Sequence, residues 1–532
     1  MSQTRPVTLS RNGMVSSPHY LASVAGMGAL QAGGTAVDAG IAMNAALGVV
    51  YPHMSGLGGD AFWLIYDARS SELHALNGSG RAGAQVTRQL FRSLGHDTIP
   101  SRGPLAAITV PGAVDSWCTA HDRFGRRPLR ELLEPAITHA REGFPVGGSQ
   151  ARYGLATADV LATHDRTRDV FLPGGTVPVL GDLLRLPHLA ETMEAVAERG
   201  RDGFYAGPVA EEMARSLQAA GGLLTTADFA AHHAEWTEPI STTYRGLTCW
   251  QPPPNSQGFA HLMILNILEG FDLASIGENT AGYVHLVVEA TKLAFTERDR
   301  YLTDPEFADI PLERLLSKEF AADLRAQIQP DRAQPVAPEY AAAGDTTCSV
   351  AVDRDGNAVS IIQSLYHEYG SGFVAGDSGV LLQNRGASFS LDDSHVNRLE
   401  PGKRTFHTLM PGMLFADRTP VMVYGTMGGE GQPQTSTAMV TRVVDFHDDI
   451  QTALDRPRWL HGRTWGADTA DLRIESRFAT AAIAGLRERG HPVRVVDDWD
   501  DCMGHAQGIQ VDGRGIFLGG ADARGEGLAL GW

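Results

Sequence analysis

The periodicity of the sequence changes near residue 345, and this change most restricts how the chain can fold. On the N-terminal side, stretches such as 36–50 and 258–268 repeat apolar residues at helical spacing, and strands are predicted at 62–67 and 73–77. The segment 329–345 loses periodicity and fills with Pro, Ala and Gly, which predicts a mobile loop. Beyond it the pattern is that of β-strands, predicted at 346–353, 357–364, 379–384 and 420–425. The main boundary of the chain is therefore expected near residue 345.

The first two of these C-terminal strands predict a hairpin that brings two hydroxyl side chains together. Residues 354–356, Arg-Asp-Gly, form a three-residue loop with glycine last, which is typical of a type I turn with a bulge. Such a loop pairs Asp353 with Asn357, and the same register then places Thr346 opposite Ser364. Directly opposed residues share a face, with Cβ atoms ~4.5–5.5 Å apart. We therefore expect the two hydroxyls to meet at the edge of a sheet, directly after the loop.

A threonine in that position has the features of an N-terminal nucleophile. A hydroxyl is a weak nucleophile and needs an adjacent base. Cleavage of the Asp345–Thr346 bond would supply one, because the freed α-amine has an unperturbed pKa of ~7.7–8.0. Two threonines at the start of a strand are also explained by ordinary β-propensity. The hairpin register favours the catalytic interpretation.

A glycine-rich turn follows the strand predicted at 420–425. There Gly428 and Gly429 precede a helical pattern that starts at Gln434. Adjacent glycines allow two backbone N–H groups to point at one developing oxyanion, and loss of one such donor typically costs ~10²–10³ in rate. A flexible strand–helix turn without catalytic function explains the pattern equally well.

Glycine is abundant, at 60 of 532 residues, and this first suggests nucleotide binding. Residues 78–83 match G-x-G-x-x-G after a predicted strand, the pattern of a pyrophosphate cradle at a helix N-terminus. The strand predicted next, 106–110, ends in Pro-Gly and carries no acidic residue to hold a ribose. A glycine-mediated turn or a substrate-contact loop is the favoured interpretation.

Composition argues against other classes of function. With 44 Lys and Arg against 62 Asp and Glu, the net charge of −18 disfavours binding to nucleic acid. The four cysteines lie far apart without a C-x-x-C pair, as in proteins of reducing compartments, and no HExxH spacing occurs. We expect no metal and no cofactor. The cysteines are Cys118, Cys249, Cys348 and Cys502.

No segment predicts a membrane span or a removed leader. The apolar part of the longest uncharged run, 39–51, has 13 residues, which suits a buried helix better than a span of ~20 residues. In 20–32 the large apolar residues recur at every third position among Ala, Gly and Ser, without a cleavage pattern. We expect a cytoplasmic protein without a membrane partner.

Several longer motifs, taken in order, resemble those of the γ-glutamyltranspeptidase family of N-terminal-nucleophile hydrolases. They are GLGGD (56–60), VPGAVDSW (110–117), PPPNSQG (252–258), RDRYLTDP (298–305), DTTCSV (345–350), GSGFVAGDSGVLLQN (370–384), KRTFHT (403–408) and GTMGGEGQPQ (425–434). The resemblance implies an α+β fold, a four-layer αββα sandwich, and self-cleavage before the nucleophile. It divides the precursor into a large-subunit segment, 1–345, and a small-subunit segment, 346–532, which together form one domain.

By this resemblance Thr346 is the nucleophile, Ser364 supports it, and Gly428 and Gly429 form the oxyanion hole. The hairpin register agrees independently on Thr346 and Ser364. The partners expected are a small-molecule amide and the two chains of the precursor itself, while a homodimer is left open.

The departures from the family concern the substrate. Members that act on glutathione hold the γ-glutamyl group with an arginine, an asparagine, an acidic residue and two serines. The matching positions here are Ser79, Tyr366, Ser388, His407 and Thr408. The α-amine of a γ-glutamyl group would therefore lack its carboxylate partner.

Cationic side chains in the same motifs suggest an anionic acyl group instead. Arg81, Arg385 and His407 could bind it through charge-assisted hydrogen bonds. The motifs are similar to the subgroup that contains oxamate amidohydrolase, so hydrolysis of a small carboxylate-bearing amide is the preferred hypothesis. A γ-glutamyl hydrolase or transferase and a glutaryl or cephalosporin-type acylase are the alternatives. A structural interpretation also stays open for two of the cations: Arg385 as a brace of the sheet and Arg81 as a solvated side chain.

Overall fold

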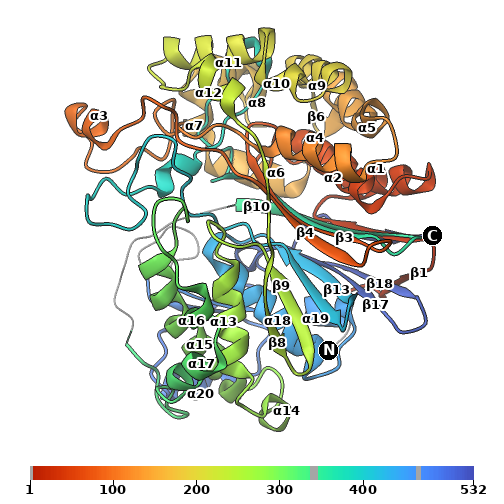
Figure 1. The fold of residues 1–532 in the computed structure, drawn as a ribbon, viewed down its shortest axis with the longest axis vertical. Helices are drawn as coiled ribbons and strands as arrows, with labels where there is room; N and C mark the ends of the chain where they lie inside the picture. The colour runs from red at the N-terminus through yellow and green to blue at the C-terminus, as the bar shows by residue number, and fades with distance from the viewer. Residues whose placement is uncertain (1–3, 336–344, 463–468) are drawn as a thin grey trace.

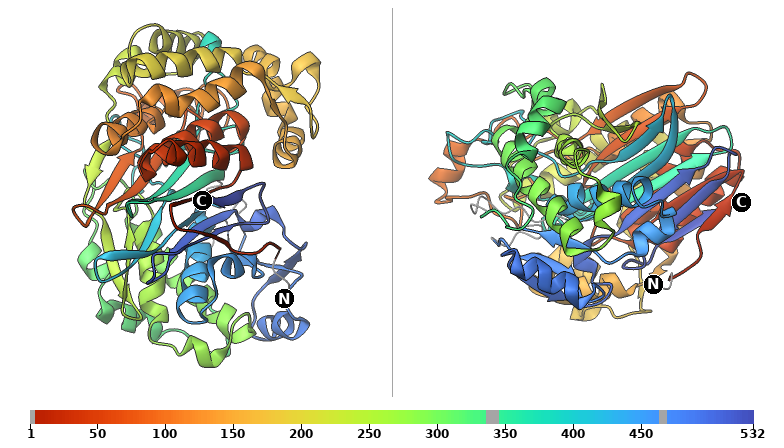
Figure 2. Two further views of the ribbon diagram at one scale, coloured as in Figure 1. Left: turned by 90° about the vertical axis from the view of Figure 1, so that its right-hand side faces the viewer. Right: turned by 90° about the horizontal axis from the view of Figure 1, so that it is seen from below.

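The architecture has four layers, as seen in a computed structural model that describes residues 4–335, 345–462 and 469–532. Two seven-stranded sheets lie face to face, and helices cover the outer side of each (Figure 1). The turned views show the same layers from the side and from below (Figure 2). The predicted αββα sandwich is confirmed.

The first sheet carries the predicted hairpin at its centre, and its neighbouring strands are antiparallel. In spatial order its strands are β19 (Leu528–Gly531), β2 (Gly13–Ser17), β10 (Asp345–Asp353), β11 (Ala358–Tyr366), β3 (Asp60–Asp67), β4 (Glu72–Gly78) and β7 (Glu235–Thr237).

The second sheet contributes the strand that runs into the glycine-rich turn. In spatial order its strands are β1 (Thr8–Ser10), β18 (Phe517–Ala521), β17 (Ala506–Val511), β13 (Thr419–Thr426), β12 (Gly412–Ala416), β9 (Leu247–Gln251) and β8 (Ile240–Tyr244).

Helices from different parts of the chain cover the two sheets. The layer on the first sheet includes α1 (Tyr20–Gln31), α2 (Ala36–Val50), α4 (Ala113–Phe124), α5 (Leu129–Glu142), α9 (Pro187–Arg199) and α11 (Pro208–Ala219). The layer on the second includes α13 (Gly258–Leu268), α15 (Ala281–Tyr301), α17 (Lys318–Arg325), α18 (Gln432–Val444), α19 (Ile450–Asp455) and α20 (Thr480–Glu488). The all-apolar face of α2 explains its place directly on the sheet, where every residue of the helix is buried.

Three hydrophobic clusters fill the three interfaces between the layers. Residues of the hairpin alternate between two of them: Val350 and Ile362 pack between the sheets, whereas Ala351 and Ile361 pack against the helices of the first layer. This alternation is the period-two pattern of a strand buried on both faces. By the same alternation Ser364 faces the space between the sheets.

Most predicted elements occur, and the exceptions have local causes. Between α4 and α5, Gly125 ends the first helix and Pro128 begins the second. The predictions of strands at 106–110 and 379–384 are wrong. Both segments make only isolated bridges, since each bonds to loops one residue at a time. The mobile loop predicted at 329–345 falls mostly on residues outside those described.

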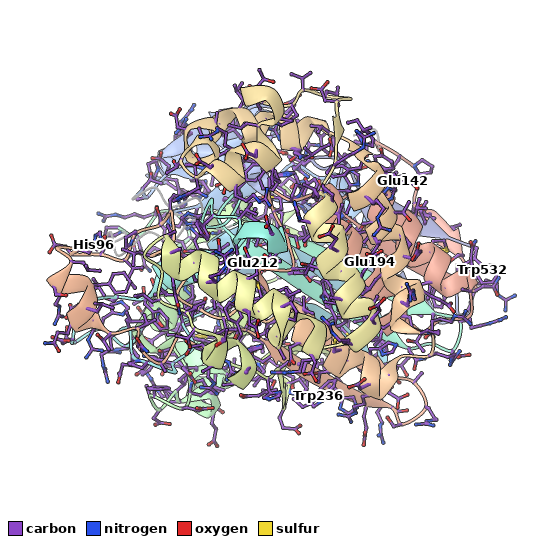
Figure 3. The ribbon with its side chains drawn as sticks, turned by 90° about the horizontal axis from the view of Figure 1, so that it is seen from above. His96, Glu142, Glu194, Glu212, Trp236 and Trp532 are labelled. Atoms are coloured by element: carbon purple, nitrogen blue, oxygen red, sulfur yellow. The ribbon has the colours of Figure 1, made fainter. Side chains whose placement is uncertain are left out.

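The outer surface of the first helical layer is rich in charge. Viewed from above, Glu142, Glu194 and Glu212 lie along these helices (Figure 3). Glu194 and Glu212 form ion pairs with Arg141 and Arg215, whose side chains are more than half exposed. Among the described residues, none of the helices has the length and apolar character needed to span a bilayer.

Candidate active site

The hairpin of β10 and β11 brings Thr346 and Ser364 together. From Thr347 opposite Gln363 onward, the strands pair in the predicted register, and the turn glycine, Gly356, has φ +88°. A bulge between Asp345 and Thr347 displaces the first residues. Thr346 Oγ1 nevertheless lies 3.4 Å from Ser364 Oγ, and both side chains are buried. The predicted juxtaposition is confirmed, while the catalytic roles remain predictions.

Ser364 is fixed by the strand end that follows it. The backbone N–H of Tyr366 donates to Ser364 Oγ at 2.8 Å. Tyr366 itself has φ +85°, a region that non-glycine residues rarely occupy, and such conformations cluster at functional sites. The strained backbone therefore orients the hydroxyl beside Thr346.

The glycine turn after β13 offers two backbone donors near the same end of the sandwich. The strands cross closely, because a Cβ on Gly425 would lie 2.6 Å from Cys348 Sγ in β10. Gly428 and Gly429 have φ of +132° and +52°, which favour glycine. Neither N–H bonds to any residue that the structure describes. Two free, adjacent N–H groups are what an oxyanion hole requires, and that role remains a prediction.

Arg385 is a buried cation without a carboxylate partner within the described chain. Its Nη2 donates to Thr408 Oγ1 at 3.3 Å, and its guanidinium lies 3.9 Å from the centre of the Tyr366 ring. Its Nε and Nη1 atoms are buried without a hydrogen-bond partner. Burial lowers the pKa of Arg385 to about 10, so it stays charged at neutral pH. A desolvated cation with unused donors is a strong anion site.

His407 is held too firmly to serve as a second free donor. Its Nε2–H donates to Asp60 Oδ2 at 3.0 Å, and its Nδ1 accepts the N–H of Leu409 at 3.4 Å. Burial, and then the charge of Arg385, lower the pKa of His407 to about 4. The imidazole is therefore neutral at pH 7, and both its nitrogens have protein partners. This geometry favours an orienting role for His407 over the predicted cationic contact.

Asp60 connects several of these segments, and sequence reasoning missed its role. Its Oδ1 accepts hydrogen bonds from the N–H groups of Gly80 and Gly112, both at 3.1 Å, and from Gln383 Nε2 at 2.9 Å. With His407 as the fourth donor, this buried carboxylate holds four separate segments in one arrangement. The signal was present as the acidic residue that ends GLGGD and opens the buried strand β3.

Arg81 lies in an ion-pair network. It contacts Glu306 at 2.6 Å, Glu235 at 3.2 Å and Asp304 at 3.5 Å. The charge of Arg81 is therefore already neutralised by carboxylates of the protein itself. This arrangement favours a structural role for Arg81 over the predicted binding of substrate. Ser79, at the position of the family's arginine, is likewise engaged, with its hydroxyl donating to Asn77.

Two other polar groupings lie outside this constellation. His285, Glu289 and His491 are close enough to suggest a metal site. The two imidazoles bond to each other at 2.8 Å, and Lys292 holds the carboxylate at 2.7 Å, so protein partners already satisfy these ligand atoms.

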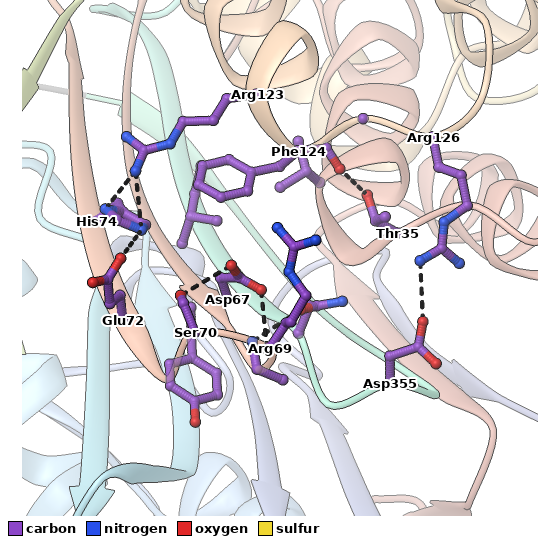
Figure 4. Close-up of a pocket in the computed structure, with 16 residues that line it drawn as sticks. Thr35, Asp67, Arg69, Ser70, Glu72, His74, Arg123, Phe124, Arg126 and Asp355 are labelled. Atoms are coloured by element: carbon purple, nitrogen blue, oxygen red, sulfur yellow. Dashed lines mark hydrogen bonds and ion pairs between the residues drawn. The ribbon is translucent and has the colours of Figure 1, made fainter.

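A surface pocket of about 700 Å³ lies beside the turns of β3–β4 and β10–β11, with Asp355 on its wall (Figure 4). It is at the end of the hairpin opposite to Thr346.

Comparisons with known proteins agree with this geometry over nearly the whole chain. The model of the family described as "Gamma-glutamyltranspeptidase" matches residues 22–532. A glutathione hydrolase-like YwrD proenzyme of Bacillus subtilis is 49% identical, with 97% of this chain and 98% of the relative covered. An oxamate amidohydrolase proenzyme of Klebsiella pneumoniae is 42% identical, with 98% and 99% covered. A solved cephalosporin acylase from Bacillus halodurans superposes with a TM-score of 0.94 at 38% identity, covering 100% of this chain and 98% of that one. The chain belongs to the γ-glutamyltranspeptidase family of N-terminal-nucleophile hydrolases.

Proposed function

We propose that this enzyme is a self-processing threonine amidohydrolase that hydrolyses a small amide whose acyl part carries a carboxylate. Cleavage between Asp345 and Thr346 yields a large chain, 1–345, and a small chain, 346–532. The freed α-amine of Thr346 then serves as the base for its own hydroxyl. The names of two relatives, both proenzymes, support the processing step.

In the proposed cycle Thr346 Oγ attacks the amide carbonyl, and its α-amine accepts the hydroxyl proton. The N–H groups of Gly428 and Gly429 stabilise the tetrahedral oxyanion. The α-ammonium returns the proton to the leaving amine, which departs and leaves an acyl-threonine ester. Water, deprotonated by the same amine, attacks this ester and releases the carboxylic acid and the free Thr346 hydroxyl. The Ser364 hydroxyl, 3.4 Å from Thr346 Oγ1, supports the nucleophile.

The observation that carries the choice of substrate is Arg385. It is buried, has two unpartnered nitrogens and sits on the ring of Tyr366, close to Thr408. A carboxylate on the acyl group would accept a hydrogen bond from one of these unpartnered donors and neutralise a charge that is otherwise costly to bury. The 42% identity to an oxamate amidohydrolase over nearly all of both chains favours an oxamate-like substrate.

Other members of the family support the alternatives. A glutathione hydrolase-like relative favours a γ-glutamyl substrate, and the cephalosporin acylase favours a longer acyl chain such as glutaryl. The absence of an acidic residue at the matching position of Ser388 argues against a γ-glutamyl α-amine. We also propose a cytoplasmic location.

A panel of amides tests the proposal. Oxamate and oxamide differ in one carboxylate, and hydrolysis of both can be followed by ammonia release. We expect turnover of oxamate, whose products are oxalate and ammonia, and at least ~10²-fold slower turnover of oxamide, as expected for loss of a charge-assisted contact. Preference for γ-glutamyl or glutaryl anilides over oxamate would select an alternative.

A further inference from the structure

We propose that Gln257 is a positioning residue that locks the glycine turn of Gly428 and Gly429 to the segment carrying Thr408. The inference rests on the proposed function, in which that turn binds the oxyanion and Arg385 beside Thr408 binds the acyl carboxylate. In this proposal Gln257 contacts neither the oxyanion nor the acyl carboxylate. It acts through the backbone carbonyls of Gly429 and Thr408.

The side chain of Gln257 joins the two segments directly. It is fully buried at the N-cap of α13, and its Nε2 donates to Gly429 O at 3.0 Å and to Thr408 O at 2.9 Å. Its backbone N–H donates to His407 O at 2.9 Å. One amide group thus uses both its hydrogens to bridge two loops that are 21 residues apart in sequence (408 to 429).

A buried ion pair fixes this amide from the other side. Arg298 of α15 donates from Nη1 to Gln257 Oε1 at 3.0 Å, and its Nη2 pairs with Glu430, the residue after Gly429. Arg298 and Glu430 are 1% and 2% exposed. The turn is therefore held on both sides of the Gly429–Glu430 peptide, through Gly429 O and through the Glu430 carboxylate.

The glycine turn needs such an external support. Gly428 and Gly429 carry no side chains, and their conformations are the permissive ones that cost most entropy to fix. Their N–H groups make no protein contact that would hold them in place within the described chain. Donors that stabilise a developing charge must be ordered before the reaction, because reorganisation during it would consume the benefit. The contacts of Gln257 and Glu430 provide that order.

The same bridge sets the distance between the two protein groups proposed to bind the substrate, namely Arg385 for the carboxylate and the glycine turn for the carbonyl oxygen. Arg385 donates to Thr408 Oγ1, and Gln257 holds the carbonyl of the same residue. The carboxylate anchor and the oxyanion turn therefore belong to one rigid frame. Such a frame discriminates between acyl groups by the spacing of carboxylate and carbonyl, because a misplacement of about 1 Å can cost ~10²-fold in rate.

The test uses Gln257→Met, which preserves length and removes every hydrogen bond of the amide, in the full precursor. Kinetics are measured after mass spectrometry has confirmed processing. Two ligands separate the states: a carboxyalkylboronic acid forms a tetrahedral adduct with a threonine hydroxyl, and oxalate mimics the ground state. We expect kcat for oxamate to fall by ~10–100-fold and the boronate Ki to rise by a similar factor. The KM for oxamate and the Ki for oxalate should change by less than about threefold.

Two further variants show whether the effect belongs to the frame. Gln451 is also buried, bonds to Asp455 at 2.9 Å and to both backbone groups of Ala521 at 3.1 Å, and lies outside the proposed site. Gln451→Met loses a matched set of bonds and should leave kcat and the boronate Ki unchanged. Arg298→Lys keeps the charge but loses the fork that reaches both Gln257 and Glu430, so it should show an intermediate kcat.

Three outcomes overturn the inference. In an active wild type, a kcat and a boronate Ki for Gln257→Met within twofold of normal would show that the bridge does not position the turn. Equal losses of boronate and oxalate affinity, together with a lower Tm, would show a general structural effect. A wild type that cleaves no carboxylate-bearing amide contradicts the proposed function itself, and the inference fails with it.

Discussion

Replacement of Arg385 by methionine separates a substrate anchor from a structural brace. Methionine keeps a flexible apolar stem but is shorter, and it lacks the guanidinium with its charge and its donors. Arg385 has two buried nitrogens without partners, Nε and Nη1. Hydrogen bonds to charged groups contribute ~1.5–3 kcal/mol each. Taking about 3 kcal/mol for the contact between guanidinium and carboxylate, we expect kcat/KM for oxamate to fall by ~10²-fold, since about 1.4 kcal/mol corresponds to a factor of ten.

The stability of the same variant should move in the other direction. Burial lowers the pKa of Arg385 from 12.5 to about 10. At any pH below about 10 the side chain is still protonated, and its buried charge makes folding less favourable. At about 1.4 kcal/mol per pH unit, this difference corresponds to a cost of about 3 kcal/mol, an upper bound because Tyr366 and Thr408 contacts are lost with the charge. We therefore expect the Tm of Arg385→Met to equal or exceed that of the wild type at pH 7.

The assay combines ammonia release from oxamate and oxamide with thermal unfolding of the processed enzyme. The rate ratio of the two amides should collapse in Arg385→Met, because oxamide does not use the guanidinium. A brace of the sheet would give the reverse pattern, namely a Tm lowered by several degrees and an unchanged ratio. That result would refute the assignment of Arg385 as the carboxylate anchor.

Three further predictions follow from the same geometry. Arg81→Met should change the ratio of the hydrolysis rates of oxamate and oxamide by less than about threefold, because Glu235 and Glu306 already neutralise Arg81. A fall in this ratio as large as that of Arg385→Met would show that Arg81 binds the substrate. In Gly428→Ala the new Cβ has no atom nearer than Gly504 Cα at 3.8 Å, but alanine must adopt a φ of +132°. We therefore expect kcat to fall ~10²-fold at nearly constant KM, and a normal kcat would exclude this turn as the oxyanion site. Burial lowers the pKa of His261 to about 3 and that of His407 to about 4, below the ordinary 6.5. The stability that these neutral imidazoles contribute is fully present above pH ~6.5 and is lost as the pH falls towards 4. A Tm that stays constant between pH 7 and pH 4.5 would contradict this expectation.

The parts of the fold that could be predicted are those encoded locally. The hairpin register follows from a three-residue loop whose last residue, Gly356, adopts a positive φ, and the loop determines which residues face each other. Helices such as α2 can be predicted because small and apolar residues fill the segment except at Asp38 and Asn44. The segments 106–110 and 379–384 have strand-like composition, yet they bond to loops that no local pattern identifies.

The candidate site shows the same division. Thr346, Ser364 and the glycine pair could be located from sequence, because their geometry depends on single strands and turns. Whether a cation is paired depends on remote segments: Glu235 and Glu306 reach Arg81 across more than 150 residues, whereas no acidic residue reaches Arg385 within ion-pair distance in the described chain. Gln257 likewise stands in the motif PPPNSQG, but its contacts with Gly429 and Thr408 exist only in the folded chain.

The intact mass of the purified protein tests the central claim most directly. The precursor has a mass of 57.0 kDa for 532 residues. Cleavage before Thr346 should give fragments of roughly 37 and 20 kDa, the smaller beginning at Thr346, because the nucleophile needs its free α-amine. Thr346→Ala should remain a single chain of full mass. A wild type that stays intact while hydrolysing its substrate, or a Thr346→Ala variant that still splits at this bond, would contradict the account.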